Sequence, residues 1–105
     1  MGPLTEKLVN ALDECELFLR RYSEERWANW LEQVSSSLRK GNIGGIYKLE
    51  SAFGGMGSIS DLLIHPINGH QIDESEVDKC NKKLRVSLSK IYDLAQKVKK
   101  NAIFD

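Results

Sequence analysis

Apolar residues recur at alternating spacings of four and three over the first 22 residues of the chain. The pattern consists of Leu4, Leu8, Ala11, Cys15, Phe18 and Tyr22. This spacing places all of these side chains on one face of an α-helix. Pro3 suits the first helical turn, where its missing N–H is not needed. The pattern therefore predicts a helix over residues 3–22 that turns one face toward a core.

A second helical pattern covers residues 24–40, and its apolar stripe consists of Trp27, Trp30, Leu31, Val34 and Leu38. We expect the hydroxyl of Ser23 to cap this helix. Gly41 follows two basic residues, which is typical of a helix end. Trp27 and Trp30 are expected to be core or half-buried rings, and an exposed recognition patch is the alternative.

A short third helix is predicted over residues 43–52. Its apolar positions are Ile46, Leu49 and Phe53. Asn42 is a suitable cap. Gly44 and Gly45 each weaken a helix by about 1 kcal/mol relative to alanine, so we expect them to allow a neighbouring helix to approach closely.

The longest predicted element is a helix over residues 74–100, which contain no glycine or proline. Asp73 and Glu76 resemble a capping box at its start. Its apolar face consists of Val77, Leu84, Leu88, Ile91, Ala95 and Val98. Phe104 is expected to dock the tail back on the bundle.

Between the third and the last helix lies a glycine-rich stretch, Phe53-Gly54-Gly55-Met56-Gly57-Ser58. We interpret it as a tight structural loop in which Phe53 and Met56 are buried and at least one glycine has a positive φ. The carboxylate of Asp61 is expected to accept hydrogen bonds from its backbone amides. The alternative is an anion-binding nest, although the stretch lacks the lysine of a phosphate-binding loop.

The segment that follows, up to residue 72, gives a mixed signal. Asn68-Gly69 between apolar residues indicates a hairpin, whereas Pro66 disfavours a central strand. We expect an irregular segment or a small two-stranded hairpin over residues 62–72. The whole pattern predicts a mainly α, four-helix bundle-like fold, with residues 1–105 forming a single domain.

The charge and the hydrophobic content of the chain argue against two classes of protein, nucleic-acid binders and membrane proteins. The 105 residues include 15 basic and 15 acidic side chains, so the net charge is zero, which argues against bulk electrostatic binding of nucleic acid. The basic residues concentrate in the last helix, where the helix dipole accounts for much of the asymmetry. No apolar run reaches the roughly 20 residues of a membrane span, and no signal peptide is visible. We therefore expect a cytoplasmic protein that does not contact the membrane.

Candidate catalytic and metal-binding side chains are few. Cys15 and Cys80 fall on apolar stripes and are expected to be unpaired, buried and inert. His65 and His70 fit no common zinc spacing, and we expect them on a loop surface. No set of nucleophile, base and orienting group is apparent. The residues therefore predict no enzyme activity, no metal and no cofactor, and Trp27, Trp30, His65 and His70 remain candidates for partner binding.

One resemblance adds a functional expectation. Trp30-Leu31, Gly41-Asn42 and the run from Phe53 to Ile64 resemble a family of small bacterial proteins of unknown function. The signature of that family is Gly-Gly-Met-Gly-Ser followed by Asp-Leu, and its members are similar to immunity proteins found beside polymorphic toxins. The matching positions are Phe53, Gly54, Gly55, Met56, Gly57, Ser58, Asp61 and Leu62. The resemblance implies a protein that binds and neutralises a cognate toxin, and it brings no catalytic residues.

Two alternatives of other classes remain. A small ligand-binding protein or enzyme would use the glycine loop with Asp61, and it would bring His65 or His70 to a pocket at that loop. A nucleic-acid binder would use the basic face of the last helix, and its affinity would fall steeply with salt.

Overall fold

A computed structural model describes residues 1–54 and 57–101 of the chain. Over these residues the secondary structure is entirely helical, which confirms the mainly α fold. The α-helices are α1 (Pro3–Arg21), α2 (Glu25–Arg39), α3 (Gly44–Ser51) and α4 (Val77–Lys100). Three single 3-10 turns join α3 to α4, namely η1 (Ile59–Asp61), η2 (Pro66–Asn68) and η3 (Glu74–Glu76). The expectations for Gly55, Met56 and Phe104 lie outside the described residues.

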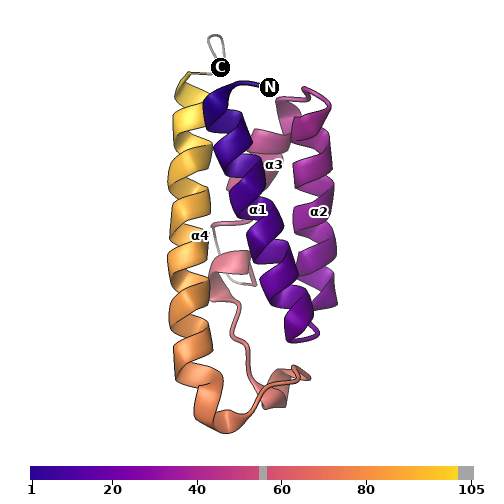
Figure 1. The fold of residues 1–105 in the computed structure, drawn as a ribbon, viewed down its shortest axis with the longest axis vertical. Helices are drawn as coiled ribbons and strands as arrows, with labels where there is room; N and C mark the ends of the chain where they lie inside the picture. Colours follow the sequence, from indigo (N-terminus) through magenta and orange to yellow (C-terminus); the bar gives the residue numbers. More distant parts are fainter. Residues whose placement is uncertain (55–56, 102–105) are drawn as a thin grey trace.

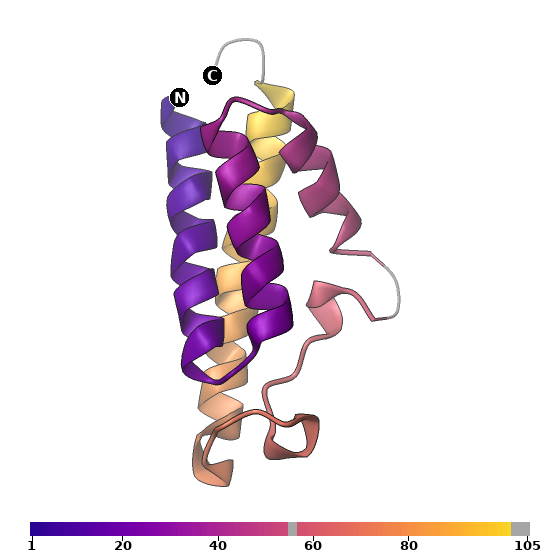
Figure 2. The ribbon, with the colours of Figure 1, turned by 90° about the vertical axis from the view of Figure 1, so that its right-hand side faces the viewer.

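The helices α1, α2 and α4 run side by side along the long axis of a molecule that measures 45 × 22 × 19 Å (Figure 1). The short helix α3 packs against both α2 and α4 on one side of this group (Figure 2). At 24 residues α4 is the longest element, and it begins within a few residues of Asp73, as the sequence predicts. Its first turns extend past the ends of α1 and α2, where the segment around η2 lies (Figure 1).

The predicted apolar stripes meet in one core. Every α-helix contributes side chains that are almost completely buried, including Leu8, Leu12, Leu31, Val34, Ile46, Leu49, Leu84 and Ile91. Ile59 and Ile64, from the segment between α3 and α4, are equally buried. Burial of a side chain of this size contributes about 1.5–3 kcal/mol, so this core is the main source of stability. Trp27 and Trp30 are half-buried and pack against it, as expected.

Gly45 shows why glycine is tolerated in α3. It is buried where α3 meets α2, and a Cβ at this position would lie 3.2 Å from Cδ2 of Leu38. The close approach expected of this glycine pair therefore occurs at Gly45. The N-cap of α3 is Ile43 rather than the expected Asn42, whose side chain accepts a hydrogen bond from the backbone N–H of Gly44 at 2.9 Å in the preceding turn.

The cap of α2 differs from the sequence-based expectation. Ser23 has a φ of +66° and lies in the turn that closes α1, because its N–H donates to the carbonyl of Arg20. Its hydroxyl makes no cap hydrogen bond. The carboxylate of Glu24 instead accepts from the N–H of Trp27 at 2.9 Å. The prediction that Ser23 caps this helix was wrong because Ser23 is used to end the preceding one.

Of the two alternatives for residues 62–72, the irregular segment is found and the small hairpin is not. Asn68 ends the 3-10 turn η2, and Gly69 follows it with a φ of +83°. Residues 65–70 bond among themselves in the turn, whereas Ile64 and Gln71 bond to other elements. Asn81 of α4 bonds to both the N–H and the carbonyl of Ile64, each at 2.9 Å. Since α4 satisfies these groups, no strand partner is needed.

Candidate functional site

The glycine loop is stabilised by its own backbone and by Asp61. The N–H of Ile59 donates to the carbonyl of Ala52 at 2.9 Å and closes the loop. Gly57 has a φ of +79°, and its N–H donates to the Asp61 carboxylate at 3.0 Å. Both expectations for this loop are confirmed at these residues. Phe53 is half-buried rather than fully buried, because its ring packs against the exposed ring of Tyr92.

A hollow of about 300 Å³ is lined in part by Gly54, and we call it the tryptophan hollow. It is lined by Trp27, Trp30, Ser51, Ala52, Gly54, Gly57 and Ser58. The two indole rings meet edge to face, with centroids 5.4 Å apart and planes at 77°. Such rings offer a rigid apolar wall with polar N–H groups, which suits contact with another molecule.

A second hollow of about 310 Å³ is also lined in part by Gly54, and we call it the tyrosine hollow. It is lined by Glu50, Phe53, Gly54, Tyr92, Gln96 and Lys99. The ammonium of Lys99 bonds to the Glu50 carboxylate at 3.0 Å and lies 5.5 Å from the ring centre of Tyr47. The hydrogen bond from Lys99 holds the pKa of Glu50 below its usual value. Both charges therefore persist at neutral pH.

The two hollows form one surface, which we call the aromatic face, defined by Trp27, Trp30, Tyr47, Phe53 and Tyr92. These are five of the eight aromatic residues in the chain. Arg26 lies over the ring of Trp27, and Lys48 lies over the ring of Trp30. Within the described residues neither cation forms an ion pair with an acidic group. The charge near the tryptophan hollow is therefore available to a partner.

The histidines do not join the glycine loop. His70 is buried, and its Nε2 lies 2.9 Å from the Glu24 carboxylate. Its Nδ1 accepts the backbone N–H of His65 at 3.0 Å, so the Nε2–H donates to Glu24. The surface position expected for His70 was wrong, because its ring fills the contact between the η2 segment and the start of α2. Neither histidine lines the tryptophan hollow or the tyrosine hollow.

Three polar residues form hydrogen bonds between segments that are distant in sequence, and the sequence did not indicate them. They are Glu24, Asn81 and Arg85. The guanidinium of Arg85 donates to the carbonyls of Ser60 and Leu62, just after the glycine loop. These partners lie 17 or more residues away in sequence, so no local pattern indicates them. They fix the glycine loop and the η2 segment on the helical core.

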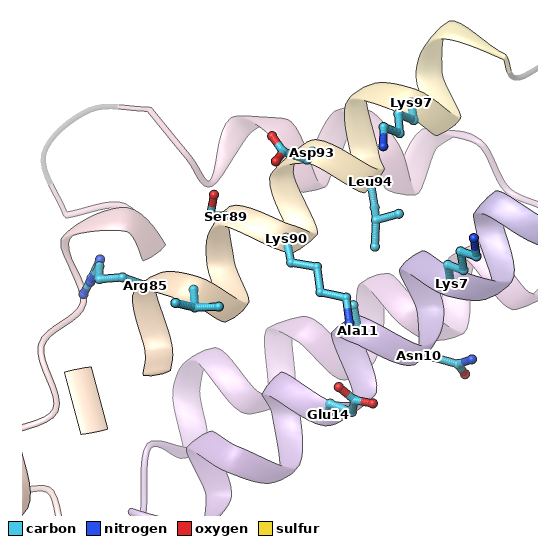
Figure 3. A pocket seen from close by; sticks show the side chains of 11 residues that line it. Lys7, Asn10, Ala11, Glu14, Arg85, Ser89, Lys90, Asp93, Leu94 and Lys97 are labelled. Carbon is cyan, nitrogen blue, oxygen red and sulfur yellow. The ribbon is translucent and has the colours of Figure 1, made fainter. Parts of the chain in front are cut away.

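A shallow groove of about 940 Å³ lies between α1 and α4. Figure 3 shows Lys90 of α4 extending across it toward α1, with Lys7 and Lys97 at one end and Glu14 on the opposite wall. The groove mixes basic and acidic side chains. None of its lining residues comes from α3, which is behind α1 in the view of Figure 1.

The cysteines behave as the sequence predicts. Cys15 and Cys80 are both buried and unpaired. Burial raises the pKa of each thiol. Among the described residues, no three His, Cys, Asp or Glu side chains lie close enough together to hold a metal ion. No helix in the described part is long and apolar enough to cross a membrane.

Comparison with known proteins gives one match. A family model described as a domain of unknown function (DUF6966) covers residues 20–73. This region contains α2, α3, the glycine loop and the η2 segment, and so all the residues that line the tryptophan hollow. The comparisons with curated proteins and with solved structures returned no match.

Proposed function

We propose that this chain, which belongs to the family described as a domain of unknown function (DUF6966), is a protein-binding module that neutralises a cognate bacterial toxin. The observation that carries the proposal is the aromatic face. Tryptophan and tyrosine dominate the binding energy of protein interfaces, especially beside pockets that accept partner side chains. The toxin as partner comes from the resemblance to immunity proteins in the run from Phe53 to Ile64.

The geometry of the aromatic face suits such docking. Gly54 lines both hollows, so one partner segment that crosses this residue reaches both. Each hollow is large enough for one side chain of the partner. Arg26 and Lys48 favour an acidic group on the partner near the tryptophan hollow. If the toxin contacts the aromatic face through its active surface, binding blocks that surface.

Paired surface substitutions test the location of the interface. Tyr47 and Tyr92 are 57% and 41% exposed, so the double variant Tyr47→Ala/Tyr92→Ala removes interface rings with little effect on the core. Leu17 and Val86 are 64% and 71% exposed and lie outside the aromatic face. The double variant Leu17→Ala/Val86→Ala is therefore the matched control. The partner used is the purified product of the adjacent toxin gene, and binding is measured by calorimetry.

We expect the tyrosine variant to weaken binding by at least about tenfold, which corresponds to about 1.4 kcal/mol, and the control to bind as the unchanged chain does. Growth of cells that express the toxin should be rescued by the control and not by the tyrosine variant. Equal binding by both variants would place the interface elsewhere. A lack of binding by the unchanged chain would remove the toxin as partner.

Gly54 offers a second test that leaves the core intact. A Cβ at this position meets no atom within 4 Å, and its φ is ordinary for any residue. The substitution Gly54→Gln should therefore preserve the melting temperature while its side chain obstructs both hollows. Unchanged toxin binding by this variant would contradict docking across Gly54.

A further inference from the structure

One face of α4 carries a continuous row of lysines, which we call the lysine stripe. It consists of Lys79, Lys83, Lys90, Lys97 and Lys100. Val86 and Asp93 complete an alternating spacing of four and three along this face. All seven side chains are exposed. Because this spacing follows the helical period, the five ammonium groups share one side of the helix.

The stripe is not neutralised within the described part of the chain. None of its five lysines forms an ion pair there. Some basic side chains outside the stripe do form ion pairs. Arg20 bonds to three glutamates, and Lys99 bonds to Glu50. Like charges one turn apart, such as Lys79 and Lys83, destabilise a helix. Asp93 is the one acidic residue among the seven positions of this face, so the stripe keeps a net positive charge.

The helix dipole explains only part of this arrangement. Lys97 and Lys100 lie in the last turn of α4, where positive charge is favourable. Lys79 lies in the first turn, where positive charge is unfavourable, and Lys83 and Lys90 lie near the middle. The helix dipole therefore does not explain the positions of Lys79, Lys83 and Lys90. A ligand that carries negative charge along the whole face is a better explanation.

We infer that the lysine stripe binds the phosphate backbone of double-stranded DNA. At a rise of 1.5 Å per residue the stripe is about 32 Å long, which corresponds to roughly nine base pairs. A straight helix face of this length fits along a straight, stiff duplex. Lysine serves as a point charge for phosphate, which needs no particular geometry. This contact is independent of the toxin-binding face and lies on a different helix surface.

Other polyanions fit the stripe less well. A protein interface needs aromatic or arginine anchors at its centre, and the stripe has only Val86 as a large apolar side chain. A single strand would require aromatic rings for base stacking, and the stripe has none. Recognition of double-stranded RNA relies on contacts to 2′-hydroxyl groups, for which lysine is not selective. Lys90 and Lys97 line the groove between α1 and α4 together with Glu14 and Asp93, so phosphates are expected on the rim of the groove, away from the two carboxylates.

Two triple variants with the same change of charge test the inference. The stripe variant is Lys83→Gln/Lys90→Gln/Lys97→Gln. The control is Arg26→Gln/Lys40→Gln/Lys48→Gln, which removes three exposed basic side chains outside α4. Binding to a fluorescent duplex of about 20 base pairs is measured by anisotropy, starting at about 20 mM salt. Circular dichroism verifies that both variants remain folded.

We expect the unchanged chain to bind with an affinity that falls with salt at a log–log slope of up to about −4.5, from five phosphate contacts. The stripe variant should bind at least about tenfold more weakly, with a slope reduced by about 2.7, and the control should bind like the unchanged chain. Absence of binding at low salt, or equal loss in both variants, would overturn the inference. Tighter binding to poly-glutamate or to a single strand than to the duplex would also overturn it.

Discussion

Replacement of His70 by alanine should destabilise the protein far more than the same change at His65. The His70 ring is 4% exposed and bridges two elements, with Nε2–H donating to Glu24 and Nδ1 accepting from the N–H of His65. Glu24 in turn caps α2 through the N–H of Trp27. The substitution His70→Ala thus removes two hydrogen bonds and a buried ring from the contact between the η2 segment and the start of α2.

The expected loss is about 3 kcal/mol. A hydrogen bond to a charged group contributes about 1.5–3 kcal/mol, and a neutral one about 0.5–1.5 kcal/mol. For a domain of this size, 3 kcal/mol corresponds to a melting temperature lower by roughly 12–24 °C. His65→Ala is the matched control. It leaves the backbone N–H that bonds to His70 and removes one exposed contact to Ile67, so it should cost less than about 1 kcal/mol.

Urea unfolding, followed by tryptophan fluorescence at neutral pH, measures these free energies. A double-mutant cycle of His70→Ala with Glu24→Ala then isolates the contact between the two side chains. We expect a coupling energy above about 1 kcal/mol. Additivity within about 0.5 kcal/mol, or equal effects of the two histidine variants, would refute the assignment of His70 as a buried bridge.

Three further outcomes follow from the structure. Asn81→Ala should cost about 1–3 kcal/mol in urea unfolding, because its amide satisfies two backbone groups of the η2 segment; an Asn81→Asp variant of full stability would contradict this. Asp61→Ala should cost only about 0.5–1.5 kcal/mol by thermal melting, since its hydrogen bond to Gly57 is exposed. The raised thiol pKa values of Cys15 and Cys80 predict slow alkylation of the native protein near pH 8, and rapid alkylation would contradict their burial. They also predict that the free energy of unfolding falls as the pH rises above about 9, because the thiols of the unfolded chain then ionise before those of the folded chain.

The sequence by itself determined the helices and the core. Spacings of three and four residues encode which side of each helix faces inward, so the buried positions of α1, α2 and α4 agree with the pattern. The sequence also predicted the glycine loop, because the loop depends on residues close together in the chain, namely Gly57 with its positive φ and the carboxylate of Asp61. The two cysteines on apolar stripes are buried for the same reason.

Only the tertiary structure decided which polar groups meet. His70 bonds to Glu24 across 46 residues, and Asn81 bonds to Ile64 across 17, so neither contact leaves a local pattern. The absence of a hairpin has the same origin, because α4 satisfies the backbone that a strand partner would otherwise use. The aromatic face likewise combines α2, α3 and α4. Periodicity reports burial along one helix, whereas partners across helices depend on how the helices pack.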